Sequence, residues 1–215
     1  MKNDKKNFWI LLFILIVPAL ACKLPFLQDE PEEEAFVLPP GQAMYNNGIV
    51  EIMLPDTYQL RDIREDVPLI SGALQFFGET TAGISVENLV NEILKNEVMW
   101  AINGDVNATG STRLLILKNK VMANVPLVLI SSSIETLFDI PEDQFDTEKL
   151  TLGEYDVVRL TLNQKESSEA IYALKDKSLL WLIIFITTPD QMQTQLSEFE
   201  ASVATFKVIS IPLEE

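Results

Sequence analysis

The chain has 215 residues and a net charge of −16 at pH 7, with 32 acidic against 16 basic residues, no histidine and one cysteine. The missing histidine excludes Ser-His-Asp and Cys-His nucleophilic catalysis and most zinc sites, and the single cysteine excludes disulfide frameworks and thiolate metal clusters. The acidic balance argues against binding to nucleic-acid phosphates, which requires a concentration of Lys and Arg. The length suits one domain of ordinary size.

The amino-terminal segment has the pattern of an export signal. Three lysines precede the 14-residue run Phe8–Ala21, which carries no charge and ends at the only cysteine of the chain. A helix that spans a bilayer needs about 20 apolar residues. A basic start followed by a shorter apolar run therefore predicts a secretory signal over residues 1–21.

The end of this signal, Ala19-Leu20-Ala21-Cys22, resembles the lipobox of bacterial lipoproteins. In that family the signal is cut just before the cysteine, which makes Ala21 the expected cleavage position. The thiol of Cys22 would then receive a diacylglyceryl group, and the new amino terminus is usually acylated as well. The resemblance implies a lipid-anchored protein on the extracytoplasmic face of a cell membrane. A soluble export signal cut elsewhere and an uncleaved anchor are the alternatives.

Residues 22–44 predict a lipidated cysteine followed by a tether. The segment is rich in proline, and five of the six residues in 29–34 are acidic. Proline and like charge both disfavour a packed core, so a solvated spacer is expected; a site for a basic partner or a cation is the alternative. The first 21 residues carry a net charge of +2, so a chain that begins at Cys22 would carry −18. Such a body is repelled by anionic headgroups.

The remaining residues, 45–210, predict one α+β domain. Tyr45–Leu54 alternates as a strand does, and Tyr58–Ile63 is expected to be its partner strand. Asp66 is the expected N-cap of a helix that ends at Gly78. Ser85 is the expected N-cap of a second helix, whose apolar residues fall on one face.

The middle of the domain predicts strands with one ambiguous segment. Glu97–Asn103 and Thr112–Lys118 are expected to be strands. Residues 124–140 have helical spacing, which favours a helix, yet Pro126–Ile130 would also serve as a strand. Three more strands are expected at 149–152, 155–162 and 170–174.

The carboxyl-terminal elements have the clearest pattern. Leu179–Thr187 is almost entirely apolar, so it is the expected centre of an antiparallel sheet covered on both faces. Thr188 is the expected N-cap of a helix with Pro189 in its first position and Gln191 placed for a capping box. The apolar stripe of that helix consists of Met192, Leu196, Phe199 and Val203. Phe206–Val208 predicts a short closing strand.

This order of elements resembles the PsbP-like fold, an antiparallel sheet flanked by helices. Two parts of the sequence carry the resemblance. One is the opening strand Ile49–Pro55. The other is the closing set, which consists of the strand 179–187, the helix that begins at Thr188-Pro189, and Ala204-Thr-Phe206. It implies a PsbP-like α/β sandwich over residues 45–210. It implies no reaction, because that fold has no shared active site.

Polar side chains that could carry chemistry are few. Ser131-Ser132-Ser133 has no histidine and no lysine at a matching spacing, so the polar side of a helix is expected. Asn103–Asn107 alternates oxygen ligands as a calcium loop does, but it lacks the terminal bidentate Glu, so a plain turn is expected. Glu142, Asp143 and Asp146 could form a general acid and base pair, although a surface role is expected in so acidic a chain.

Trp100 and Trp181 lie on expected strands among apolar neighbours. Core packing is therefore expected, and an aromatic platform for a sugar or peptide is the alternative.

We therefore expect a non-enzymatic, membrane-anchored lipoprotein that binds an unknown protein partner as an accessory or assembly factor at the cell envelope. No catalytic, cofactor-binding or metal-binding residue is predicted, and no nucleic acid is expected as a partner. A module that captures a small ligand or cation for a transporter is the first alternative. A carboxylate-based hydrolase is the second.

Overall fold

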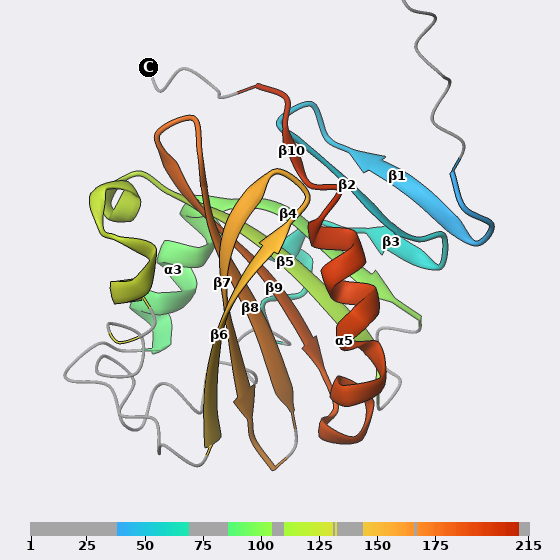
Figure 1. Cartoon of the computed structure of the whole chain (residues 1–215). Coiled ribbons are helices and arrows are strands. Elements are labelled where there is room, and N and C mark those ends of the chain that lie inside the picture. The colour runs from blue at the N-terminus through green and yellow to red at the C-terminus, as the bar shows by residue number, and fades with distance from the viewer. Residues whose placement is uncertain are drawn as a thin grey trace, which may run out of the picture. The chain divides into compact units, whose positions relative to one another are not determined.

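The computed structural model describes residues 38–68, 86–104, 110–130, 132, 144–165 and 167–210. Its centre is a seven-stranded sheet in which all neighbouring strands are antiparallel (Figure 1). From edge to edge, the strands are β3 (Tyr58–Leu60), β4 (Glu97–Asn103), β5 (Thr112–Asn119), β9 (Leu179–Thr187), β8 (Ser168–Asp176), β7 (Tyr155–Asn163) and β6 (Phe145–Leu152).

Strand β9 occupies the middle of this sheet, between β5 and β8. Seven of its nine residues are buried, because both faces of the sheet are covered. This confirms the position expected from its nearly continuous apolar run. The antiparallel sheet with helices on its faces confirms the α+β class.

A second sheet of three strands consists of β1 (Gln42–Asn46), β2 (Val50–Pro55) and β10 (Lys207–Val208), with β2 in the centre. The single strand expected over Tyr45–Leu54 is therefore wrong. Asn47 and Gly48 turn the chain: Gly48 has a φ of +84°, and Oδ1 of Asn47 accepts the backbone N–H groups of Ile49 and Val50, each at 3.0 Å. Such Asn-Gly turns favour a tight hairpin. Strand β1 begins at Gln42, inside the segment assigned to the tether.

The partner expected for the opening strand is also wrong. Strand β3 pairs with β4, with Tyr58 opposite Asn103, so it belongs to the larger sheet. It ends at Leu60, and a 3-10 turn, η2 (Ile63–Glu65), follows. Pairing between strands far apart in sequence leaves no local signal, which explains this second error.

Helices α3 (Val86–Asn96) and α5 (Pro189–Val203) confirm two of the expected helices. Thr188 has the extended backbone of an N-cap, but its side chain makes no capping hydrogen bond. Oε1 of Gln191 instead accepts the hydroxyl of Thr187 at 3.0 Å, so the expected capping box is wrong. Most of the helix expected after Asp66 lies outside the described residues.

The ambiguous segment at 124–140 is helical where the structure describes it. A 3-10 turn, η3 (Val121–Asn124), precedes helical backbone at 127–130. Apart from Ser132, residues 131–140 lie outside the described chain. The described part therefore favours the helix over the strand.

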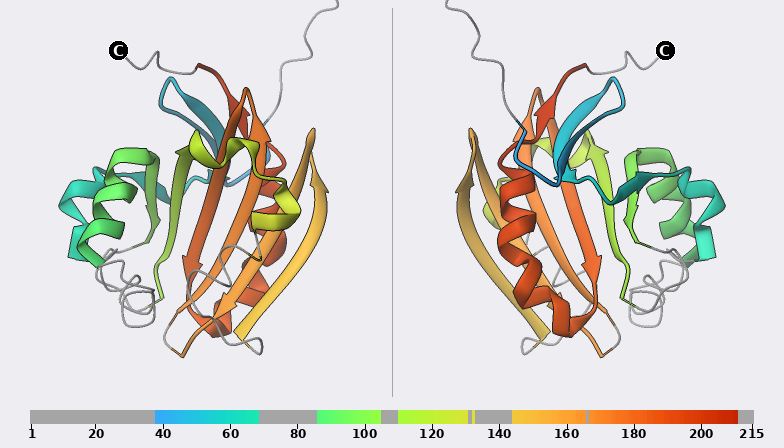
Figure 2. Two further views of the ribbon diagram at one scale, coloured as in Figure 1. Left: turned by 90° about the vertical axis from the view of Figure 1, so that its left-hand side faces the viewer. Right: turned by 90° about the vertical axis from the view of Figure 1, so that its right-hand side faces the viewer.

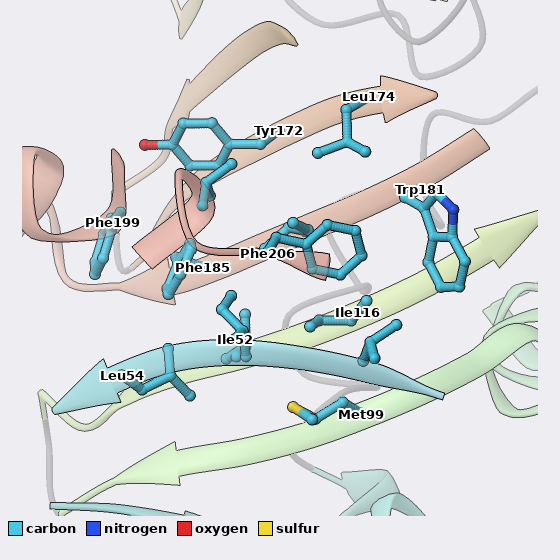
Figure 3. Close-up of a cluster of buried hydrophobic side chains, with 14 of the residues drawn as sticks. Ile52, Leu54, Met99, Ile116, Tyr172, Leu174, Trp181, Phe185, Phe199 and Phe206 are labelled. Carbon is cyan, nitrogen blue, oxygen red and sulfur yellow. The ribbon is translucent and has the colours of Figure 1, made fainter. Parts of the chain in front are cut away.

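The domain has three layers, seen side by side in Figure 1, and Figure 2 shows the two opposite faces. Helix α5 and the three-stranded sheet cover one face of the large sheet, and α3, η2 and the 121–130 segment cover the other. The main core lies on the α5 face, where Phe185 of β9 stacks on Phe199 of α5 with ring centroids 4.2 Å apart (Figure 3). The expected stripe of α5 is confirmed, since Met192, Phe199 and Val203 are buried and Leu196 packs against the core.

Candidate functional site

The predicted lipidation site lies outside the described residues. Ala21 and Cys22 both fall in residues 1–37, so cleavage and acylation stay predictions. Within the described chain, no helix has the length and apolar character needed to cross a membrane.

The tryptophans are core residues. Trp100 is 1% exposed and Trp181 is completely buried. This confirms the expected core packing and rules out the alternative, an aromatic platform for a sugar or peptide. The ring of Trp181 packs against Phe206 with centroids 5.6 Å apart, on the α5 face (Figure 3).

Few of the other sequence candidates lie among the described residues. Ser132 is exposed and donates to the backbone carbonyl of Leu129, which agrees with the polar side of a helix. Asp146 is exposed on the edge strand β6. The remaining candidates, residues 105–107, 131, 133, 142 and 143, lie outside the described residues.

A buried charge cluster instead forms around Asp66, which follows η2. Asp66 is only 4% exposed, and its carboxylate accepts Nε of Arg61 at 2.7 Å and Nη2 at 3.0 Å. The indole Nε1 of Trp100 donates to the same carboxylate at 2.9 Å. The hydrogen bonds from Arg61 are the main reason that the pKa of Asp66 is lowered. The sequence predicted a helix cap here, and helical backbone begins at residue 67; the Asp66 side chain also joins η2 to the sheet.

Arg113 of β5 adds a second cation to this face. Burial lowers the pKa of its guanidinium, against the opposing effect of the Asp66 charge. Its Nε is buried without a hydrogen-bond partner among the described residues. Arg113 lies opposite Ile186, and Ile186 lies opposite Glu169 of β8. Two strand spacings, about 10 Å, therefore separate the backbones of Arg113 and Glu169, and neither group's charge is among the causes of the other's pKa shift.

Glu169 is itself a buried carboxylate, with 3% exposure. It accepts the hydroxyl of Ser167 at 2.8 Å and the amide of Gln164 at 3.2 Å, both from the turn between β7 and β8. Burial raises the pKa of Glu169 to about 7, although the hydrogen bond from Ser167 acts in the opposite direction. Within the described chain, no Arg or Lys side chain forms an ion pair with Glu169 as Arg61 does with Asp66 and Arg159 does with Glu148.

The opposite face of the sheet carries a third set of charges. Arg159 of β7 is 8% exposed and forms ion pairs with Glu148 of β6 and Glu200 of α5. One buried cation thus joins two strands to the carboxyl-terminal helix. The hydroxyl of Tyr172 is buried nearby, and burial raises its pKa.

Asp66 and Arg159 each join separate elements of the fold, and Glu169 binds the turn between β7 and β8. General acid–base or nucleophilic chemistry requires that the reacting groups reach a substrate, and Asp66, Arg159 and Glu169 are all almost inaccessible. Within the described ranges, no three His, Cys, Asp or Glu side chains are placed to hold a metal ion. The arrangement therefore favours a structural role for the charges.

The sequence carries a signal for these charges, although none of them was among the predicted site residues. Arg159, Arg113 and Glu169 each stand inside a strand whose other residues are largely apolar. Period-two alternation places Arg159 on the same face as Tyr155 and Val157. A charged residue at such an inward position predicts a buried partner.

Three of the exposed large apolar side chains lie close together in sequence. Val121, Val128 and Leu129 are 88%, 50% and 50% exposed, and all three belong to the segment that lies over β8 and β9. Large apolar side chains that gather on a surface mark interaction sites more often than isolated ones do. This stretch is the candidate interaction surface of the described chain.

Comparison with protein-family models gives no match, and comparison with curated proteins gives none either. Among solved structures, the chain is similar to cyanobacterial PsbP (CyanoP) from Synechocystis sp. PCC 6803, with 12% identity and a TM-score of 0.45 over 80% of this chain and 95% of that one. It is also similar to LpqN, which is involved in cell envelope biogenesis of Mycobacterium tuberculosis, with 8% identity and a TM-score of 0.41 over 78% and 90% of the two chains.

A third similar structure, from Bacteroides thetaiotaomicron, has 10% identity and a TM-score of 0.42 over 81% of this chain. The chain spans half the length of that protein. At these identities and scores the PsbP-like assignment stays a prediction. The α+β class rests on the strands and helices described above.

Proposed function

We propose that the chain is an extracytoplasmic lipoprotein, anchored to the cell membrane through Cys22, whose PsbP-like domain works by binding a protein partner at the cell envelope. The observation that carries this proposal is the uncharged run Phe8–Ala21 that ends at the only cysteine of the chain. A run of this length is typical of a signal, and a cysteine placed at its end is what lipid attachment requires.

The anchor has a simple energetic basis. Each buried CH₂ group contributes about 0.8 kcal/mol, and one acyl chain binds a membrane only reversibly. Two or three chains on Cys22 and its amino group would hold the protein stably. The acidic body would then be kept at the membrane by the lipid despite its charge.

A binding role accounts for the domain better than catalysis does. The chain lacks histidine, its one thiol is assigned to the anchor, and Asp66, Glu169 and Arg159 are buried within the fold. Among its described residues the domain exposes an apolar stretch at 121–129. A rigid domain with a local apolar surface suits an accessory or assembly factor.

Replacement of the lipidated sulfur tests the anchor. Cys22→Ser in the full chain, expressed in a bacterial host that processes lipoproteins, should move the protein out of the membrane fraction or leave it unprocessed. Ser132→Ala, an exposed hydroxyl far along the chain, is the matched control and should fractionate as the parent does. Unchanged membrane association of Cys22→Ser, with a mature terminus elsewhere, contradicts the proposal.

Cross-linking in intact cells tests the partner. Attachment to an envelope protein that is not a transporter supports the accessory role. Specific attachment to a transporter complex supports a ligand-capture module instead, and it overturns the accessory role.

A further inference from the structure

The sequence contains two Asn-Gly dipeptides, Asn47-Gly48 and Asn103-Gly104, and both lie among the described residues. An asparagine before a glycine can react with its own backbone, because glycine has no side chain to obstruct the approach. The glycine nitrogen attacks Cγ of the asparagine and forms a C–N bond, while the side-chain nitrogen leaves as ammonia with the proton that the glycine N–H gives up. Water then opens the succinimide ring at either carbonyl and leaves aspartate or isoaspartate.

The two dipeptides are closely matched at their glycines. Gly48 and Gly104 have φ angles of +84° and +91°, both are exposed, and no other group lies within 4 Å of a Cβ added to either one. The asparagines differ in exposure, since Asn47 is exposed and Asn103 is half-buried. Exposure alone therefore predicts that Asn47 reacts first.

The side-chain amide of Asn47 is held at both of its polar atoms. Its Oδ1 accepts the backbone N–H groups of Ile49 and Val50, each at 3.0 Å. Its Nδ2 donates to the backbone carbonyl of Val98 at 2.5 Å. The amide that must turn toward the glycine nitrogen is therefore fixed between the turn and strand β4.

The same turn also holds the attacking nitrogen. The N–H of Gly48 donates to Oδ1 of Asn46 at 2.7 Å, and the N–H of Asn47 donates to the carbonyl of Val50 at 3.3 Å. Ring closure is intramolecular, so its rate depends on how often Cγ and the nitrogen meet in the right orientation. At Asn47 that orientation requires several hydrogen bonds to break together, and each of them favours the resting geometry.

The side-chain amide of Asn103 has no such restraint. Among the residues that the structure describes, it makes no hydrogen bond. Asn103 is the last residue of β4, opposite Tyr58 of β3 and Thr112 of β5, and Gly104 lies in a bend beyond the strand. Rotation about the Cα–C bond of Asn103 brings the nitrogen of Gly104 toward Cγ and disturbs only the end of each ladder. Strand ends open more readily than strand centres.

We propose that Asn103 is a site of spontaneous modification, at which the chain gains an aspartate or an isoaspartate, and that the fold protects Asn47. Either product adds a negative charge at the end of β4. Isoaspartate also adds a methylene group to the backbone where β4 leads into the connection to β5. This inference concerns the domain alone and does not depend on the lipid anchor.

Peptide mapping of the folded and the unfolded chain tests this inference. The full purified chain is incubated in mildly alkaline buffer, in parallel without denaturant and in concentrated guanidinium chloride. Trypsin places the two asparagines in separate peptides, 96–113 and 24–61. Fragmentation in the mass spectrometer then identifies the converted residue, and chromatography separates isoaspartate from aspartate.

Faster conversion of the less exposed asparagine is the expected result. In the folded chain Asn103 should react at least about tenfold faster than Asn47, because the loss of two hydrogen bonds of ordinary strength slows a reaction by this factor or more. In guanidinium the two should react at similar rates, since both precede glycine and the turn is gone. Asn103→Gln is the control: its longer side chain closes only a larger ring, so conversion at 103 should stop while the rate at Asn47 stays unchanged.

Three results would overturn the inference. If Asn47 reacts as fast as Asn103 in the folded chain, the hydrogen bonds of the turn do not protect it. If neither residue reacts in the folded chain while both react in guanidinium, the end of β4 protects Asn103 as well. If the difference between the two rates persists in guanidinium, the neighbouring sequence sets the rates and the fold does not.

Discussion

The buried carboxylate of Glu169 should give the domain a stability that falls as the pH rises. Burial raises the pKa of this group from 4.5 to about 7 in the folded chain, while the unfolded chain keeps an ordinary value. Below pH 4.5 both states hold the proton, so the full stability is present. Between the two pKa values only the folded state holds it, and the free energy of unfolding therefore decreases with pH.

The size of this loss follows from the difference in pKa. A shift of one pKa unit corresponds to 1.36 kcal/mol, so a shift of this size costs about 3 kcal/mol, and the loss is complete above pH 7. Glu169→Gln has almost the same shape, keeps an acceptor for the hydroxyl of Ser167, and has no charge to bury. It should therefore remove this part of the pH dependence.

Urea denaturation at pH 4.5 and at pH 8, followed by the fluorescence of the buried tryptophans, measures the effect. The free energy of unfolding of Glu169→Gln, minus that of the parent, should increase by about 3 kcal/mol between the two pH values. Glu87→Gln, an exposed position on α3, is the control and should show no such change. A difference for Glu169→Gln that stays constant within about 0.5 kcal/mol would falsify the assignment of a buried, protonated carboxyl.

Three further substitutions test the packing. Phe199→Ala should cost about 3–5 kcal/mol by opening a cavity under α5; a melting temperature within a degree of the parent would mean that the helix is not docked. Gly153→Ala should cost more than about 2 kcal/mol, because its Cβ would lie 2.3 Å from the carbonyl oxygen of Ala204 at a φ of +59°; Gly48→Ala, with open space around its Cβ, should cost less, and equal losses in thermal melts would refute the clash. Asp66→Ala should cost about 2–3 kcal/mol by leaving a guanidinium and an indole N–H without their acceptor; a loss below about 0.5 kcal/mol in urea would show that this cluster adds little.

Periodicity alone was sufficient for the elements that are long and strongly apolar. The continuous run of β9 predicted its central place in the sheet, and the stripe on α5 predicted the face that carries Phe199. Strands β4 and β9 begin and end at the expected residues. In these elements local pattern and burial agree, so the tertiary structure adds little that the sequence does not already indicate.

The errors arose where pairing partners are distant. The Asn-Gly turn that separates β1 from β2 was a local signal, but the alternation of Val50, Ile52 and Leu54 was extended across it. The pairing of Tyr58 with Asn103 bridges 45 residues. No local pattern specifies that partner, and the closure of the small sheet by β10 is equally non-local.

The charged interior shows the same limit. Single charged residues within apolar strands signalled that partners were needed, but the identities of those partners depend on which elements meet. Asp66 meets Arg61 and Trp100 only because η2 folds back on β4. Period-two alternation could have placed Arg159 on the inner face of β7, but Glu200 comes from a helix packed across the sheet.

Mass spectrometry of the amino-terminal peptide of the protein, isolated from the membrane of a bacterial host, tests the central claim most directly. The account predicts a peptide that begins at Cys22, with a diacylglyceryl thioether on its sulfur. A mature chain that begins at another residue, or that carries Cys22 with a free thiol, contradicts it.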